Sequence, residues 1–63
     1  MMTFSQTVRA MRAAKGWTQL ELANAIGLSR QSIMAIENGS SPRWKVAKKL
    51  SQVLEFSLDH TEL

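Results

Sequence analysis

A very short turn between two helix-forming segments is the feature that most constrains how this chain can fold. Thr18 and Glu21 have the spacing of a capping box, in which each side chain satisfies a backbone N–H at the start of a helix. Gly27 ends that helix, because glycine enters the left-handed conformation at little steric cost. Ser29 can cap a further helix two residues later. The sequence therefore predicts two steeply crossed helices within about residues 18–38.

The apolar residues before, within and after this pair recur with the three-to-four-residue spacing of amphipathic helices. Thr3 or Ser5 can cap a first helix, which ends at Lys15 and Gly16, and the turn Asn38–Pro42 leads into a fourth helix. In chain order, the apolar positions of the four segments are Phe4, Val8 and Met11, then Leu22, Ala23 and Ile26, then Ile33 and Ile36, then Trp44, Ala47, Leu50, Val53 and Leu54.

These segments predict an all-α fold. Ser57 can cap a final short turn, so we expect a compact bundle of about five short helices in a single domain over residues 1–63. A chain of 63 residues buries only about 60% of the surface that it exposes when unfolded. It has no cysteine, so neither disulfides nor zinc–thiolate sites can reinforce the core. Packing alone must hold the fold together, and we expect modest stability.

The composition points away from a membrane and toward a polyanionic partner. No apolar run approaches the roughly 18 to 20 residues of a membrane span, and the N-terminus lacks the pattern of a signal peptide, so we expect a cytoplasmic location. The net charge is +3, but residues 1–54 carry eight basic and two acidic side chains, a net charge of +6. Lysine and arginine contacts to phosphate release counterions, which favours nucleic acid as the partner.

The chain resembles the phage repressor and Cro-type (XRE-like) helix-turn-helix transcriptional regulators, most clearly in the stretch TQLELANAIGLSRQSIMAIENGSSP. The matching positions, within a region from about Val8 to Asp59, are Met11-Arg12, Thr18-Gln19, Leu22-Ala23, Gly27, Ser29, Ile33, Ile36-Glu37, Asn38-Gly39 and Pro42. The resemblance implies a bundle whose third helix is the recognition helix. It also implies a sequence-specific regulator, foremost a repressor, that binds a short two-fold symmetric operator in double-stranded DNA as a homodimer, without a cofactor.

The exposed face of the predicted third helix carries the side chains that would meet base edges. At about 100° per residue, the face opposite the apolar stripe carries Gln31, Met34, Ala35 and Asn38. Arg30 lies at the edge of this face. Arg30 and Gln31 can pair bidentately with guanine and adenine in the major groove. Met34 and Ala35 can contact a thymine methyl group, and partial burial at the edge of the core is an equal alternative for Met34.

A second set of polar residues is placed to hold the DNA backbone. Gln19 and Ser29 stand at the starts of the second and third helices, where free N–H groups and the positive end of the helix dipole favour phosphate. The resemblance implies the phosphate contact for Gln19, whereas Ser29 is a cap in any case. Further candidates beyond the recognition helix are Asn38, Ser40, Arg43 and Lys45. Such contacts position the protein without reading sequence, and ordinary turn or surface chemistry is the alternative for each.

Two charged residues call for a structural explanation. Arg12 and Glu37 flank the apolar faces of the first and third helices. An unpaired charge in such a place is costly, whereas a paired and hydrogen-bonded one is tolerated. The resemblance implies that the two residues form a partly buried ion pair that ties the first helix to the recognition helix.

The chain departs from the family pattern after the fourth helix. A glycine commonly closes that helix in the family, but this chain has Glu55, which either adopts a strained positive φ or lets the helix continue. Thr61 stands where the family tends to have an apolar residue, which puts a full fifth helix in question. The candidates for a homodimer contact are Phe56, Leu58 and Leu63, and closing the core is the alternative for Phe56 and Leu58.

The sequence also bears on two other classes of function. An enzyme is disfavoured, because His60 is the single histidine and there is neither a cysteine nor a glycine-rich phosphate loop. Asp59 and Glu62 beside His60 can at most hold a stray metal ion, so we expect no metal site. The stronger alternative is a protein-interaction or antitoxin-type module with the same fold. The residues that argue for retained DNA binding, without excluding an additional protein partner, are Gln19, Arg30, Gln31 and Arg43.

Overall fold

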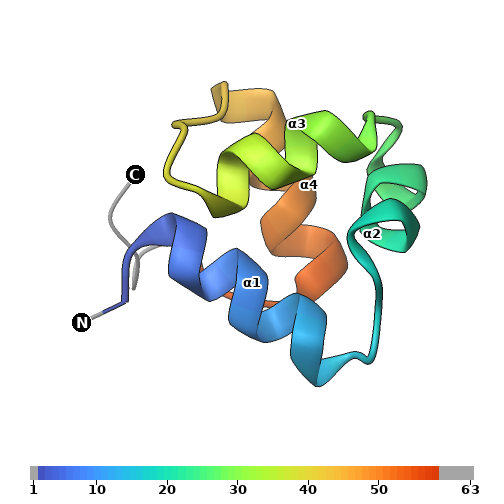
Figure 1. Ribbon diagram of the computed structural model, residues 1–63. Coiled ribbons are helices and arrows are strands. Elements are labelled where there is room, and N and C mark those ends of the chain that lie inside the picture. Colours follow the sequence, from blue (N-terminus) through green and yellow to red (C-terminus); the bar gives the residue numbers. More distant parts are fainter. Residues whose placement is uncertain (1, 59–63) are drawn as a thin grey trace.

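The computed structural model describes residues 2–58, which form four α-helices and no β-strand (Figure 1). The helices are α1 (Phe4–Ala14), α2 (Gln19–Ile26), α3 (Arg30–Glu37) and α4 (Trp44–Leu54). Both α1 and α2 pack against α3 and α4. The all-α prediction is confirmed for this part of the chain with four helices. Thr61, the residue that put a full fifth helix in question, lies outside the described residues.

A capping box fixes where α1 begins. Thr3, and not Ser5, is the N-cap: its hydroxyl accepts the N–H of Gln6 at 3.2 Å, and the Thr3 N–H donates to the Gln6 amide oxygen at 3.0 Å. The reciprocal bonds satisfy two donors that the helix itself leaves open. At the other end Lys15 is the C-cap and Gly16 follows at φ 72°, as the sequence predicts.

The turn between α2 and α3 has the predicted chemistry. The Thr18 N–H donates to the Glu21 carboxylate at 2.8 Å, and the Thr18 hydroxyl accepts the Glu21 N–H at 3.0 Å. Gly27 ends α2 in the left-handed conformation, at φ 74°. The hydroxyl of Ser29 then accepts the N–H of Ser32 at 3.2 Å and starts α3. This short connection sets the angle at which α3 leaves the body of the protein.

The apolar stripes of all four helices meet in one core. Its buried members are Phe4, Val8, Leu22, Ala23, Ile26, Ile33, Ile36, Ala47, Leu50 and Leu54. Phe56 and Leu58 are half-buried and pack against this core, and the ring of Phe56 lies 5.9 Å from that of Phe4, centroid to centroid. Both residues therefore help to close the core, and each keeps part of its surface exposed.

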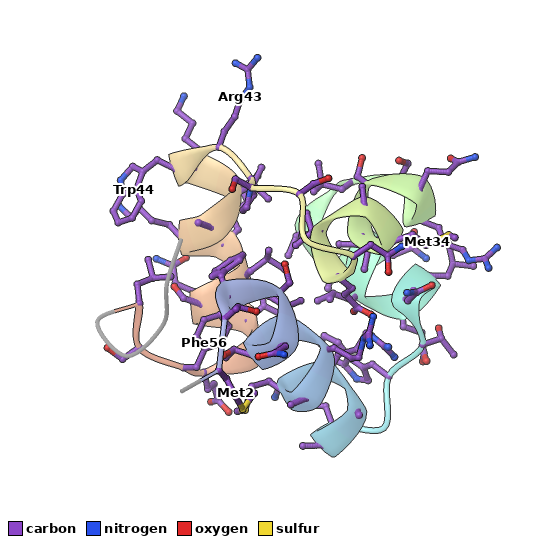
Figure 2. All side chains as sticks on the ribbon, turned by 60° about the vertical axis from the view of Figure 1, so that its left-hand side comes forward. Met2, Met34, Arg43, Trp44 and Phe56 are labelled. Atoms are coloured by element: carbon purple, nitrogen blue, oxygen red, sulfur yellow. The ribbon has the colours of Figure 1, made fainter. Side chains whose placement is uncertain are left out.

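Trp44 is an exception to the apolar pattern of α4. It shares the spacing of the buried residues but is 59% exposed, so helical spacing does not predict its burial. Side chains in a helix lean toward its N-terminus. Trp44 is the first residue of α4, and its ring therefore projects beyond the packed body of the protein (Figure 2).

The end of α4 settles the question raised by Glu55. This residue ends the helix with φ 60° and ψ 52°, and it is the one non-glycine residue with a positive φ in the described part of the chain. The N–H of Phe56 then donates to the carbonyl of Ser51 at 3.0 Å. Of the two alternatives, the structure has the strained φ rather than a continued helix.

Replacing Glu55 with glycine is expected to stabilise the protein. Glycine avoids the roughly 1–2 kcal/mol that a Cβ adds in the left-handed region, so the free energy of unfolding should rise by about 1 kcal/mol. For a chain of this size the melting temperature would then rise by roughly 4–8 °C. Glu55→Ala is the matched control, because it removes the Lys15–Glu55 ion pair (3.6 Å) but keeps the positive φ. A glycine variant that melts no higher than wild type would contradict the strain.

Candidate nucleic-acid interface

The outer face of α3 brings the four predicted base-reading residues together. The buried residues of the helix are Ile33, Ile36 and Glu37, so its opposite side faces solvent. On that side the exposed residues are Arg30, Gln31 and Ala35, and Met34 is half-buried. In Figure 2, Met34 lies on the side of the protein away from Trp44. The first turn thus offers hydrogen-bonding groups, and the second turn offers a small apolar surface.

The predicted backbone contacts lie at the two ends of this face. Ser29 is exposed at the start of α3, where its hydroxyl lies 3.0 Å from that of Ser32. Asn38 is the exposed C-cap of α3, Arg43 is the N-cap of α4, and Lys45 is exposed in the first turn of α4. Arg43 extends away from the body of the protein (Figure 2).

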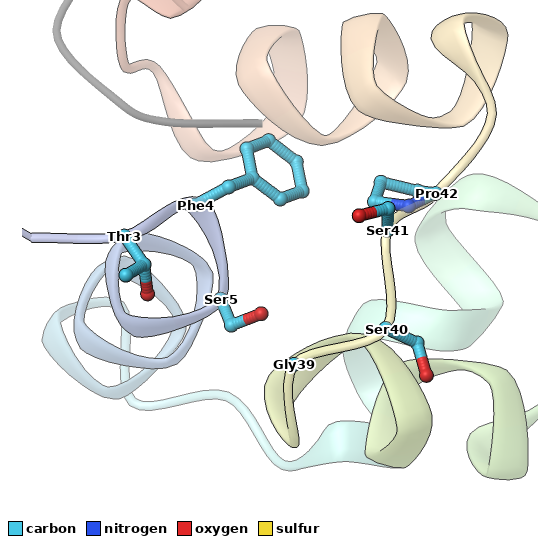
Figure 3. A pocket seen from close by; sticks show the side chains of 7 residues that line it. All are labelled: Thr3, Phe4, Ser5, Gly39, Ser40, Ser41 and Pro42. Carbon is cyan, nitrogen blue, oxygen red and sulfur yellow. The ribbon is translucent and has the colours of Figure 1, made fainter.

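Ser40 belongs to the loop that joins α3 to α4. This loop and the start of α1 enclose a hollow whose lining residues are Thr3, Phe4, Ser5, Gly39, Ser40, Ser41 and Pro42. Figure 3 shows that the hydroxyl of Ser40 points away from the hollow, whereas Phe4 points across it toward Pro42. Ser40 is therefore placed to meet a ligand outside the hollow.

Glu37 is a buried charged residue that accepts hydrogen bonds from several side chains behind this face. Its side chain is only 1% exposed, and the guanidinium of Arg12 binds it twice: Nε donates to Oε2 at 2.6 Å and Nη2 donates to Oε1 at 3.1 Å. Arg12 Nη1 also donates to the carbonyl of Trp17 at 2.7 Å. The structure thus brings Arg12 and Glu37 together and joins α1, the turn before α2, and the end of α3.

Two further side chains reach Glu37. The amide Nε2 of Gln19 donates to its Oε1 at 3.1 Å. Arg9 Nη2 donates to the backbone carbonyl of Glu37 at 3.2 Å, and Arg9 Nε lies 3.8 Å from Oε1. No motif singles out Arg9 in the sequence. The signal that could have found it is its position three residues before Arg12, which places both on one face of α1.

The electrostatics of this cluster keep Glu37 ionised. Burial raises the pKa of the Glu37 carboxyl, but the hydrogen bonds from Arg12 and Gln19 and the charges of Arg12 and Arg9 outweigh it. The pKa therefore lies below the ordinary value of 4.5. The hydrogen bond to Glu37 raises the pKa of Arg12 further, against the effect of its own burial. A charged pair thus stands at the edge of the core at neutral pH.

This lowered pKa predicts how stability depends on pH. Because the folded-state pKa lies below the unfolded value of 4.5, ionised Glu37 contributes stability above that pH, and the contribution is lost as the pH falls through the folded-state pKa. Below pH 4.5 the melting temperature of wild type should therefore fall more steeply than that of Glu37→Gln, which has no titratable group at this position. Melting curves that fall in parallel for the two proteins on acidification would contradict this assignment.

The acidic side chains do not offset the basic surface near α3. Only Glu21 and Glu37 precede residue 55; Glu21 is held in the capping box of α2, and Glu37 is buried. The exposed charges at α3 and at the start of α4 are those of Arg30, Arg43 and Lys45. Positive charge therefore dominates this surface, as a phosphate backbone requires.

Some predicted residues fall outside the described part of the chain. These are Leu63, named for a homodimer contact, and Asp59, His60 and Glu62, named for a stray metal ion. Within residues 2–58 there is no group of three or more His, Cys, Asp or Glu side chains that could hold a metal ion. None of the helices in this range is long and apolar enough to cross a membrane.

A crossed α2–α3 pair with a basic and polar outer face defines a helix-turn-helix fold. The family described as "Helix-turn-helix" matches residues 8–60, and the chain belongs to this family, in its Cro/C1-type branch. The resemblance noted from the sequence is thereby confirmed.

Two relatives illustrate the relationship. The chain is 34% identical over 58 residues to YqaE of Bacillus subtilis (strain 168), an uncharacterized HTH-type transcriptional regulator; the match covers 90% of this chain and 50% of the relative. It is also 34% identical over 53 residues to an uncharacterized HTH-type transcriptional regulator of Archaeoglobus fulgidus, covering 82% of this chain and 76% of the relative. The chain therefore spans half the length of the first relative. No solved structure is significantly similar to it.

Proposed function

We propose that the protein is a sequence-specific regulator of transcription that binds double-stranded DNA by inserting α3 into the major groove. The observation that carries the proposal is the outer face of α3, where Arg30 and Gln31 are exposed side by side in the first turn. Their side chains can pair bidentately with guanine and adenine. The relatives named as transcriptional regulators support the same class of function.

The dimensions of α3 suit this role. An α-helix with its side chains is about 10–12 Å across, which fits the major groove of B-DNA, about 12 Å wide. Around it, Asn38, Ser40, Arg43 and Lys45 hold phosphates beyond the end of α3, and Ser29 holds one at its start. Gln19, whose amide donates to Glu37, holds a phosphate beside the end of α3. These contacts fix the register of the helix, while the first turn of α3 reads the bases.

One such helix reads only a few base pairs, so we propose that two copies bind a two-fold symmetric operator with half-sites about 34–36 Å apart. The described part of the chain measures 26 × 22 × 19 Å, a size that lets two copies sit side by side at this spacing. The exposed Trp44, on the same side as Phe56 in Figure 2, joins the predicted candidates Phe56, Leu58 and Leu63 for the contact. Repression is the simplest outcome, because a dimer bound at a promoter blocks RNA polymerase. Activation would require an additional surface that contacts the polymerase.

A selection from randomised duplexes tests this function. Purified protein should enrich a short site with two-fold symmetry, at a fixed salt concentration, because phosphate contacts depend strongly on salt. If no sequence is enriched and binding is weak and lost with salt, the regulator is the wrong function. The protein-interaction or antitoxin-type module then takes its place.

The second turn of α3 leads to a prediction about thymine. Met34 and Ala35 have no directional donor for a base edge, so we propose that they contact a thymine methyl group. Replacing one critical thymine of the selected site with uracil removes only that methyl and should weaken binding several-fold, on the order of one buried CH₂. Ala35→Gly is the matched variant: it should bind the thymine and uracil duplexes more equally. Equal affinity of wild type for both duplexes at every thymine would contradict the contact.

A further inference from the structure

We propose that Arg9 and Gln19 together hold one phosphate of the DNA backbone. The inference rests on the proposed function and adds to it a residue that the helix-turn-helix motif does not contain. It is carried by four observations: the two side chains converge on one carboxylate, both have donors left over, the cluster has surplus positive charge, and that charge is exposed.

The two side chains come from different helices but meet at one atom. Gln19, the first residue of α2, donates to Oε1 of Glu37 at 3.1 Å. Arg9, on α1, lies with its Nε 3.8 Å from the same oxygen, and its Nη2 donates to the Glu37 carbonyl at 3.2 Å. A phosphate that one of these side chains reaches is therefore within reach of the other.

Both side chains keep donors for a ligand. A guanidinium has five N–H groups, and within residues 2–58 Arg9 uses one nitrogen, Nη2, in a hydrogen bond. The amide of Gln19 has two N–H groups, of which Glu37 accepts one. Phosphate oxygens are acceptors only, so the donors that remain match their chemistry.

The cluster also carries more positive than negative charge. Two guanidiniums, those of Arg9 and Arg12, surround the single carboxylate of Glu37. The side chain of Arg12 is 17% exposed and donates two hydrogen bonds to the carboxylate, so it neutralises the negative charge of Glu37. The surplus charge rests on Arg9, whose side chain is 59% exposed. An anion from solvent would compensate it.

The position of the cluster suits a backbone contact and not a base contact. Glu37 is the last residue of α3, whereas Arg30 and Gln31 are its first two. At 1.5 Å per residue the two ends are about 10 Å apart. With the first turn of α3 at the base edges, Arg9 and Gln19 lie toward the phosphates that border the groove.

The test is the salt dependence of binding to the selected duplex. Each phosphate neutralised contributes about 0.9 to the slope of log affinity against log salt. Arg9→Ala should lower the magnitude of this slope by about that amount and weaken binding roughly three- to tenfold. Lys49→Ala is the matched control: it removes one exposed charge beside the hollow between the end of α2 and α4, and should keep the wild-type slope. Arg9→Lys, which retains the charge, should also keep it.

A double substitution tests whether the phosphate is shared. Gln19→Ala removes no charge, so it should weaken binding with little change in slope. If both residues hold one phosphate, the loss of affinity in Arg9→Ala/Gln19→Ala is smaller than the product of the single losses. Circular dichroism of each variant confirms that the protein compared is folded.

The outcomes separate this inference from the proposed function. An Arg9→Ala protein that is folded and keeps the wild-type slope overturns the phosphate contact, even though the regulator stands. Losses that multiply in the double variant overturn the sharing of one phosphate. If wild type binds no duplex in preference to others, the proposed function fails, and the inference fails with it.

Discussion

Glu37→Ala is expected to remove most of the stability of the protein. The substitution leaves the guanidinium of Arg12 at the edge of the core without its carboxylate, and it takes a hydrogen-bond acceptor from Gln19. Breaking one side of a buried pair costs about 3–5 kcal/mol. That loss rivals the whole stability of a chain of this size, which is roughly 0.05–0.15 kcal/mol per residue.

Urea unfolding followed by circular dichroism measures this loss. Glu21→Ala is the control, because it also removes a carboxylate, but one that is exposed in the capping box of α2; about 1 kcal/mol is expected there. Replacing both partners in Arg12→Met/Glu37→Leu should recover much of the stability, since no unpaired charge remains. A Glu37→Ala protein that is as stable as the Glu21→Ala protein would contradict the structural role of the pair.

Arg30→Ala/Gln31→Ala is expected to abolish sequence preference while the fold persists. Both residues are exposed, so truncating them leaves the core intact. A good bidentate pair discriminates against the wrong base by about 1–3 kcal/mol, so the loss of two pairs should reduce the ratio of specific to non-specific affinity by roughly 30-fold to 10⁴-fold. Binding to unrelated duplexes should fall far less, because other residues hold the phosphates.

Competition between the selected duplex and an unrelated duplex measures that ratio. Lys49→Ala/Gln52→Ala is the matched control: it removes one cation and one amide from exposed positions of α4 beside the hollow at the end of α2. The control should keep the wild-type ratio. If the Arg30→Ala/Gln31→Ala protein distinguishes the two duplexes as well as the control does, the first turn of α3 does not read the bases.

The parts of the fold that follow from local chemistry could be predicted from the sequence. The capping box of Thr18 and Glu21, the left-handed Gly27 and the cap at Ser29 each depend on neighbours within a few residues, and all three are confirmed. The apolar spacing likewise identified the buried apolar residues of α1 to α3, because a helix repeats its faces regularly.

The remaining features depend on which elements end up beside one another. Trp44 shares the apolar spacing of α4, but it is the first residue of the helix and is 59% exposed. Arg9 became part of the Glu37 cluster only because the end of α3 lies against α1. The strain at Glu55 could be named in advance as one of two alternatives, but the choice between them required the backbone angles.

The most direct test of the central claim, that α3 enters the major groove by its first turn, is to map amide chemical shifts of the protein while the selected duplex is added. The account predicts the largest changes over residues 29–35, with smaller ones at Gln19 and over residues 38–45, and little change in the second half of α4. Changes centred on Trp44 and Phe56, with α3 unaffected, would contradict it and assign the binding to a different surface.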